Sequence, residues 1–367
     1  MKGMTKSIVI ILMALMLVFA ACDNTTGGGS DPGNPDGPIG PQTIDVYTAG
    51  YEENALGDRN IKVWKNDELL YSIETKNCSV KKIFVSGNDI YILAEEYDPD
   101  NIWRSKLWKN DQVLYTYVHQ SGWLGLVTNI FVSGNDVYVT DYEYTTSGTR
   151  SYLVKVWKND TVLYTLSGST GKGTSARGIY VSNNDVYVCG SSLNDYNHDI
   201  ATVWKNGNRL FTFGDNVTSG GAGSSSYAVK VLGSTVYASH RGNLDTADIY
   251  KYTGSILRPC SYYIYSQDSY FSMGNSFDVE ANAPNDIYWF GGNSDIARIF
   301  KGNTEIYTFN DKAVTDLAVK NGNVYLSGCE LETGVLKAKV WKNGEELYTL
   351  TDGTFDARAM SIFLAVR

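Results

Sequence analysis

Lys155-Val156-Trp157-Lys158-Asn159-Asp160-Thr161-Val162-Leu163-Tyr164 is the stretch that decides the fold. Close copies occur at 62–71, 106–115, 202–211 and 339–348, and looser copies at 249–257 and 299–307. One aromatic residue anchors each copy: Trp64, Trp108, Trp157, Trp204, Tyr250, Phe300 and Trp341. By subtraction of those numbers, successive anchors are 44, 49, 47, 46, 50 and 41 residues apart. A period in the forties indicates a repeat protein whose units stack on one another.

A second phrase precedes most copies, for example Ile83-Phe84-Val85-Ser86-Gly87-Asn88-Asp89-Ile90-Tyr91-Ile92. It returns at 130–139, 179–188, 229–237, 279–289 and 317–326. Apolar and β-branched residues on both sides of a Gly/Asn/Asp pair predict a hairpin. The Asn-Asp or Asn-Gly pair after each Trp-Lys predicts a second tight turn, because these residues tolerate φ > 0. Each repeat should therefore contain four short antiparallel strands, called A, B, C and D in chain order.

Two hairpins in about 46 residues with an aromatic-rich strand are typical of a β-propeller blade. The repeats begin at 45–50, which matches strand B without a strand A before it, and end at 358–366, which matches strand A without a strand B after it. In a closed ring the last strand completes the first blade, so no half-blade keeps a raw edge. Seven B strands predict an all-β, closed seven-bladed propeller over 44–367; a six-bladed ring or a β-sandwich shares the strand count but not the matched ends.

The N-terminus has the pattern of an export signal. Lys2 and Lys6 precede an apolar run from 8 to 21, which is short for a membrane span. Phe19-Ala20-Ala21-Cys22 resembles the lipobox of bacterial lipoproteins, although Leu is usual where Phe19 stands. The resemblance implies a signal peptide at 1–21 and a lipid anchor, with palmitate among its acyl chains, on Cys22. The alternative is an ordinary secreted protein with an incidental cysteine.

Residues 22–43 are rich in glycine and proline and predict a flexible tether that does not pack. The mature chain thus resembles bacterial β-propeller lipoproteins. Its Trp-Lys-Asn repeat is not the motif of WD40, kelch or sialidase propellers. The resemblance implies a location in the cell envelope, at the outer membrane or the cell surface, with the lipid as the link to the membrane.

The net charge limits the possible partners, and the cysteine content indicates the state of the thiols. The formal net charge of −9 disfavours nucleic acid, which needs a basic surface. Four cysteines remain after Cys22, and we expect mostly buried thiols rather than a disulfide framework. The repeated tryptophans should fill the space between blades. No motif predicts a cofactor.

The connections are uneven, which is the best functional indication. The A–B and C–D turns are short in almost every repeat, whereas the B–C and D–A connections are long and variable and share one face of a propeller. Long loops are free to carry binding residues, and exposed aromatics are good anchors. Trp103, Trp123, Tyr196, Tyr262, Tyr263, Tyr265 and Tyr270 are the candidate binding residues, the last four in a predicted loop at 258–276. The alternative is that the sequences of these loops vary without a binding role and that their tyrosines only cover the ends of the blades.

Catalytic and metal-binding patterns are weak. His119, His198 and His240 come from different loops without metal-ligand spacing, so we expect solvated histidines and no metal site. The sequence contains neither a nucleophile elbow nor a phosphate-binding loop. The leading hypothesis is a non-enzymatic module that binds an unknown protein or polysaccharide on the long-loop face. The alternative is a glycan-acting enzyme with loop carboxylates at the central funnel.

Overall fold

The computed structural model describes residues 43–97, 102–118, 123–145, 152–166, 173–214, 223–242, 246–264, 272–280, 283–292 and 296–367. Thr43–Arg367 forms one compact unit. The predicted signal peptide, Cys22 and the tether up to Gln42 lie outside the described residues. Within the described ranges, no helix has the length and hydrophobicity needed to cross a membrane.

Seven four-stranded antiparallel sheets are the blades, each with its strands in the order A, B, C, D. Blades one to four are β28 (Ala357–Val366), β1 (Ile44–Glu53), β2 (Arg59–Lys65), β3 (Glu68–Ile73); β4 (Cys78–Ser86), β5 (Asp89–Tyr97), β6 (Trp103–Lys109), β7 (Gln112–Tyr117); β8 (Trp123–Ser133), β9 (Asp136–Thr145), β10 (Tyr152–Lys158), β11 (Thr161–Leu166); and β12 (Thr174–Ser182), β13 (Asp185–Leu193), β14 (Asp199–Lys205), β15 (Asn208–Phe213). Blades five to seven are β16 (Val229–Leu232), β17 (Thr235–Arg241), β18 (Thr246–Tyr252), β19 (Leu257–Ile264); β20 (Ser272–Glu280), β21 (Ala283–Gly292), β22 (Ile296–Lys301), β23 (Thr304–Asn310); and β24 (Lys312–Lys320), β25 (Asn323–Glu332), β26 (Val335–Lys342), β27 (Glu345–Thr349).

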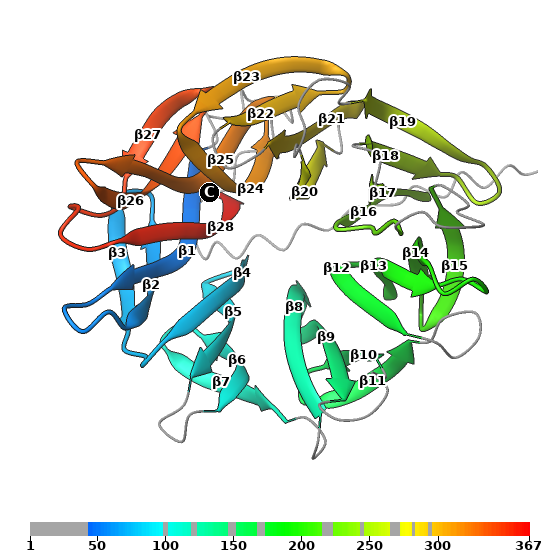
Figure 1. Cartoon of the computed structure of the whole chain (residues 1–367), viewed down its shortest axis with the longest axis horizontal. Coiled ribbons are helices and arrows are strands. Elements are labelled where there is room, and N and C mark those ends of the chain that lie inside the picture. The colour runs from blue at the N-terminus through cyan, green and yellow to red at the C-terminus, as the bar shows by residue number, and fades with distance from the viewer. Residues whose placement is uncertain are drawn as a thin grey trace, which may run out of the picture. The chain divides into compact units, whose positions relative to one another are not determined.

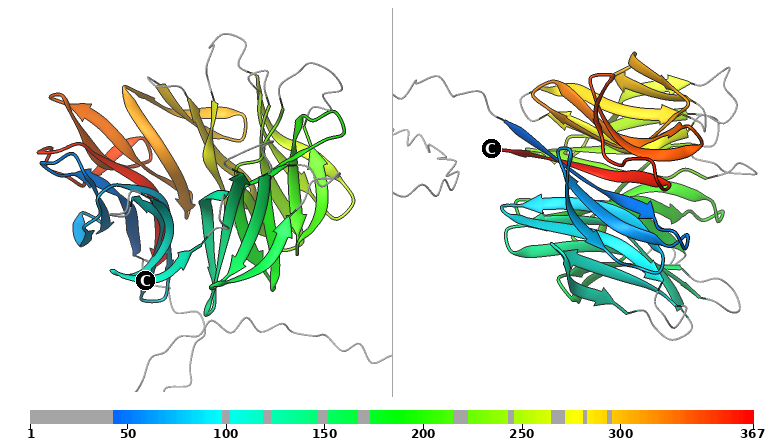
Figure 2. Two further views of the ribbon diagram at one scale, coloured as in Figure 1. Left: turned by 60° about the horizontal axis from the view of Figure 1, so that its bottom comes forward. Right: turned by 90° about the vertical axis from the view of Figure 1, so that its left-hand side faces the viewer.

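The blades form a ring with strand A innermost and strand D at the rim (Figure 1). The C-terminal strand β28 pairs with β1, with Ile44 opposite Val366 and Thr48 opposite Ile362. Figure 2 shows β28 in red beside β1 in blue. The predicted closed seven-bladed propeller, completed by the C-terminal strand, is therefore confirmed.

The Trp-Lys-Asn phrase is explained by contacts inside each blade. In blade three, Asn159 adopts a φ of 58°, its N–H donates to Val137 O at 2.7 Å, and its Oδ1 accepts the N–H of Val137 at 3.0 Å. Lys158 bonds Asp136 at 2.8 Å and lies 5.7 Å from the Tyr138 ring centre. This pair of hydrogen bonds, which we call the asparagine clasp, recurs in blades one, two, four and seven. The repeated polar residues therefore fasten the C–D turn to the start of strand B.

The Leu-Tyr part of the phrase marks a β-bulge. In all seven blades the C–D register shifts at the aromatic anchor, so that one residue of strand D is extra. In blade three this extra residue is Leu163. Trp64, Trp108, Trp204 and Trp341 are buried at the blade interfaces, as predicted. Trp157 is only half-buried, and its Nε1 donates to Asp141 Oδ2 at 3.2 Å.

A buried aspartate joins the innermost strands of successive blades where the ring closes. Asp316 of blade seven accepts hydrogen bonds from Ser361 Oγ at 2.8 Å and from Ile362 N at 3.1 Å, both on the closing strand β28. It also accepts a bond from Lys82 Nζ of blade two at 2.6 Å. One carboxylate thus connects three consecutive blades.

The connections divide the propeller into two faces. The short-turn face carries the A–B and C–D turns, and the long-loop face carries the B–C and D–A connections. The predicted asymmetry has exceptions: Thr333-Gly334 is a tight B–C turn in blade seven, and Asp311 alone joins β23 to β24. The predicted loop at 258–276 is wrong in part, because 258–264 belongs to strand β19 and 272–276 to β20.

Candidate functional site

Two B–C loops on the long-loop face have the same rigid construction. In blade one, Asn54 Oδ1 accepts the N–H groups of Leu56 at 2.9 Å and Asp58 at 3.0 Å. In blade four, Asn194 Oδ1 accepts the N–H groups of Tyr196 at 2.9 Å and His198 at 3.0 Å. An asparagine that bonds its own following backbone imposes a turn without help from neighbours. The two loops are therefore held in shape by local bonds.

Each of these loops displays one large side chain at its tip. Leu56 is 85% exposed and Tyr196 is 61% exposed. In blade two, Trp103 is 42% exposed, and its ring centre lies 5.3 Å from that of Tyr97. The structure thus places the predicted residues Trp103 and Tyr196 on the long-loop face with accessible side chains, and it adds Leu56.

The other predicted site residues lie in strands or outside the described residues. Trp123 begins β8, and its backbone pairs with Thr145. Tyr262 and Tyr263 are not loop residues: they belong to β19, the rim strand of blade five, opposite Asp248 and Ala247. Tyr265, Tyr270 and the lipid-attachment residue Cys22 lie outside the described residues.

A cationic and aromatic cluster lies at the inner end of the long-loop face, over blades four and five. Arg177 Cζ lies 4.5 Å and Arg241 Cζ 5.7 Å from the centre of the Tyr227 ring. Both arginines are exposed and Tyr227 is half-buried. Among the residues that the structure describes, neither guanidinium forms an ion pair with a carboxylate.

The backbone positions this cluster. Arg177 is the extra residue of a bulge in β12, between Ala176 and Gly178 in the register with β13. A side chain at Gly178 would approach Tyr227 O and Ala228 Cα to 3.1 Å, so the glycine permits close contact between the two blades. Two backbone hydrogen bonds, of 2.9 and 3.0 Å, join Arg241 to Ser225.

Tyrosines and hydroxyl groups border the cluster. Tyr142 and Tyr152 stack with ring centres 5.6 Å apart and an interplanar angle of 14°. Burial, followed by neighbouring Tyr152 and Tyr144, raises the pKa of Tyr142 to about 12, while Arg177 opposes the rise. Tyr142 therefore keeps its proton at neutral pH. Nearby in blade four, Ser175 and Ser191 share a hydrogen bond of 2.8 Å.

Two buried acidic groups of this face are paired with lysines. Buried Glu95 lies 2.9 Å from Lys81, and buried Glu143 lies 2.6 Å from Lys155. These two ion pairs neutralise the charges of the buried carboxylates inside the protein.

Three carboxylates gather at Glu330, Glu332 and Glu346 in blade seven, with their oxygens within 4.8 Å of one another. Lys339 occupies the space between them: its Nζ lies 3.1 Å from Glu330 and 2.7 Å from Glu346 and also bonds Glu332. Although burial opposes the effect, these hydrogen bonds raise the pKa of Lys339. The ammonium group takes the place that a metal ion would need.

The histidine and cysteine expectations have different outcomes. The prediction of a solvated histidine is wrong for His240: its side chain is buried, and its Nδ1 lies 3.2 Å from Asp248 Oδ2. His198 is half-buried, and His119 lies outside the described residues. Cys78, Cys189 and Cys329 are free and buried as expected. Burial raises the pKa of the Cys78 and Cys189 thiols to about 12.

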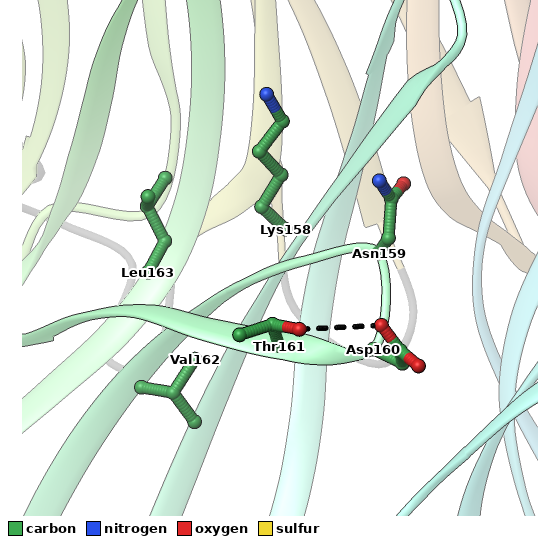
Figure 3. A pocket seen from close by; sticks show the side chains of 6 residues that line it. All are labelled: Lys158, Asn159, Asp160, Thr161, Val162 and Leu163. Carbon is green, nitrogen blue, oxygen red and sulfur yellow. Dashed lines mark hydrogen bonds between the residues drawn. The ribbon is translucent and has the colours of Figure 1, made fainter.

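A pocket of about 260 Å³ lies at the rim of blade three, lined by Lys158, Asn159, Asp160, Thr161, Val162 and Leu163 (Figure 3). Val162 and Leu163 point to opposite sides of β11, and Thr161 bonds Asp160 at 3.3 Å. These residues form the C–D turn and bulge that recur in other blades. The pocket is therefore explained by the repeat itself.

Sequence reasoning missed Arg177, Tyr227 and Arg241. Arg177 occupies the bulge position that holds Lys81 in blade two, Thr128 in blade three and Thr315 in blade seven. A blade-by-blade alignment of strand A would have shown an unusual residue at this position. No sequence pattern shows that Arg241, 64 residues later, reaches the same tyrosine.

No family model matches the sequence, and no curated protein matches it. Similar solved structures include a puromycin-hydrolysing peptidase of Mycobacterium tuberculosis, with 10% identity, 86% of this chain and 52% of that chain covered, and a TM-score of 0.48. This chain thus spans about half the length of the peptidase. The Dos1 propeller has 10% identity, coverage of 89% and 92%, and a TM-score of 0.46. A Trypanosoma rangeli sialidase bound to the inhibitor DANA has 10% identity, coverage of 86% and 57%, and a TM-score of 0.44. Such values carry no argument about function.

Proposed function

We propose that this chain is a membrane-anchored extracytoplasmic lipoprotein whose propeller is a non-enzymatic binding module. Its ligand, a protein or a polysaccharide, is held on the long-loop face. The observation that carries the proposal is the display of Leu56, Trp103 and Tyr196 on that face, two of them at the tips of loops fixed by their own asparagine.

Rigid, exposed side chains are suited to binding because little conformational entropy remains to be lost. The short-turn face is built for a different purpose. Its asparagines and aspartates are engaged with strand B, as Asn159 is with Val137 and Asp136 with Lys158. A ligand on the long-loop face would leave those stabilising bonds untouched.

The position of the first described residue agrees with this division. Thr43 O accepts the N–H of Arg367 at 3.0 Å, at the short-turn end of β1 and β28. A flexible tether of the predicted length reaches about 25 Å from a lipid on Cys22.

The test is a binding screen of the full-length protein against envelope proteins, host proteins and polysaccharides. Each hit is then measured with Leu56→Ala, Trp103→Ala and Tyr196→Ala, and with the rim variant Leu163→Ala as the matched control. Loss of an exposed anchor should weaken binding about tenfold, the effect of truncating one important interface residue. The proposal is wrong if every hit survives the three loop variants or depends on Leu163 instead.

A further inference from the structure

We propose that the inner end of the long-loop face, at Arg177, Tyr227 and Arg241, binds an acidic polysaccharide through its carboxylates. The inference rests on the proposed function and names the ligand class of that face.

These arginines differ from other cations of the protein. Cations elsewhere are commonly matched with acids, as Lys81 is with Glu95, Lys155 with Glu143 and Lys82 with Asp316. Arg177 and Arg241 instead share the Tyr227 ring, and neither has a carboxylate partner in the described part of the chain. In a protein of net charge −9, two exposed guanidiniums over one ring, neither paired with a carboxylate among the described residues, form a local site for an anion. One carboxylate, that of Asp199, lies at the border of this site, where it accepts a hydrogen bond from Ser191 Oγ at 2.9 Å.

The geometry of the guanidiniums favours a carboxylate. A guanidinium that lies over an aromatic ring keeps its N–H edge directed away from the ring, and this edge matches the two oxygens of a carboxylate. The bulge at Arg177 and the paired backbone bonds of Arg241 fix where the two side chains start. The ordering cost of binding is therefore partly met before the ligand arrives.

The surroundings of the arginines favour an acidic polymer of sugars over an acidic peptide. They are polar and include flat rings: the stacked Tyr142 and Tyr152 rings, and the hydroxyl of Ser175, which shares a 2.8 Å hydrogen bond with buried Ser191. Tyrosine faces pack against the flat faces of sugar rings, and their phenol groups and the Ser175 hydroxyl can exchange hydrogen bonds with sugar hydroxyls. An acidic peptide would gain from the arginines but would leave these hydroxyl partners unused.

The experiment measures binding of the full-length protein to immobilised polygalacturonate, to its methyl ester and to polyglutamate. The wild type should bind polygalacturonate, with much weaker binding to the uncharged ester and to polyglutamate. Arg177→Gln and Arg241→Gln should each weaken binding about tenfold or more, the loss expected for a charged hydrogen-bonding group. Arg177→Lys keeps the positive charge but removes the two parallel N–H donors of the guanidinium, and it should also weaken binding.

Arg209→Gln is the matched control, because Arg209 is an exposed arginine at the rim of the same blade as Arg177. It removes the same charge and should leave binding unchanged. Equal losses in Arg209→Gln and Arg177→Gln, equal binding to the methyl ester, or tighter binding to polyglutamate would each overturn the inference. If polygalacturonate does not bind while another ligand is lost in Tyr196→Ala, this inference falls and the proposed function stands.

Discussion

Asp316→Asn tests how the ring is closed. The substitution keeps the shape of the side chain but turns one oxygen into an amide N–H₂ donor. Asp316 is 3% exposed and accepts four described hydrogen bonds, from Leu317 N, Ser361 Oγ, Ile362 N and Lys82 Nζ, at 3.0, 2.8, 3.1 and 2.6 Å. In the variant, at least one of these donors faces another donor, and Lys82 loses its counter-charge.

Removing one partner of a buried ion pair costs about 3–5 kcal/mol, and the partial exposure of Lys82 favours the lower end. A loss of about 3 kcal/mol should lower the melting temperature by roughly 5–10 °C in a domain of this size. The assay is thermal unfolding followed by circular dichroism. The control is Asp286→Asn, which breaks the exposed 2.7 Å pair with Lys301 and should cost at most about 1 kcal/mol. If both variants melt alike, Asp316 does not hold the blades together.

Three further predictions concern closure, turns and anchoring. Deletion of 362–367 should destabilise the whole domain, because it exposes Ile362 and its apolar neighbours at about 1.5–3 kcal/mol per side chain; a truncated protein that melts like the wild type would contradict a closed ring. Replacing Asn159-Asp160 with Val-Val should lower the unfolding midpoint in urea, because valine resists the φ of 58° found at Asn159 and cannot accept from Val137 N; an unchanged midpoint would show that the clasp does not stabilise the fold. Cys22→Ser should leave the membrane fraction or remain as precursor, and a variant that fractionates and migrates as the wild type would refute lipid attachment.

The architecture could be predicted because the repeat carries it in local residues. Asn159 specifies a turn by its own tolerance of positive φ, and the half-blades at the two ends of the repeats leave closure by β28 as the consistent solution. Blade five is harder to predict. Its copy of the phrase is loose, its C–D turn spans 253–256, and Pro259 stands inside strand β19, so the sequence pattern at Tyr262 and Tyr263 favours a loop where the structure has a strand.

The candidate site could be predicted only in part. Trp103 and Tyr196 could be predicted because the repeat pattern places both residues at the long connections and the sequence shows that both are aromatic; the structure leaves both side chains exposed. Arg177 and Arg241 could not be predicted as a site. Their contact with the same Tyr227 ring depends on which residue of β12 lies in the bulge and on how two blades pack together. Burial of His240 beside Asp248 likewise follows from packing between strands rather than from spacing along the chain.

Hydrogen–deuterium exchange of the full-length protein, with and without the first ligand found by the binding screen, tests the central claim most directly. Binding on the long-loop face predicts slower exchange at 54–58 and 194–198, with no change at the turns 66–67, 110–111 and 159–160 on the opposite face. Protection confined to those turns would contradict the assignment of binding to the long-loop face.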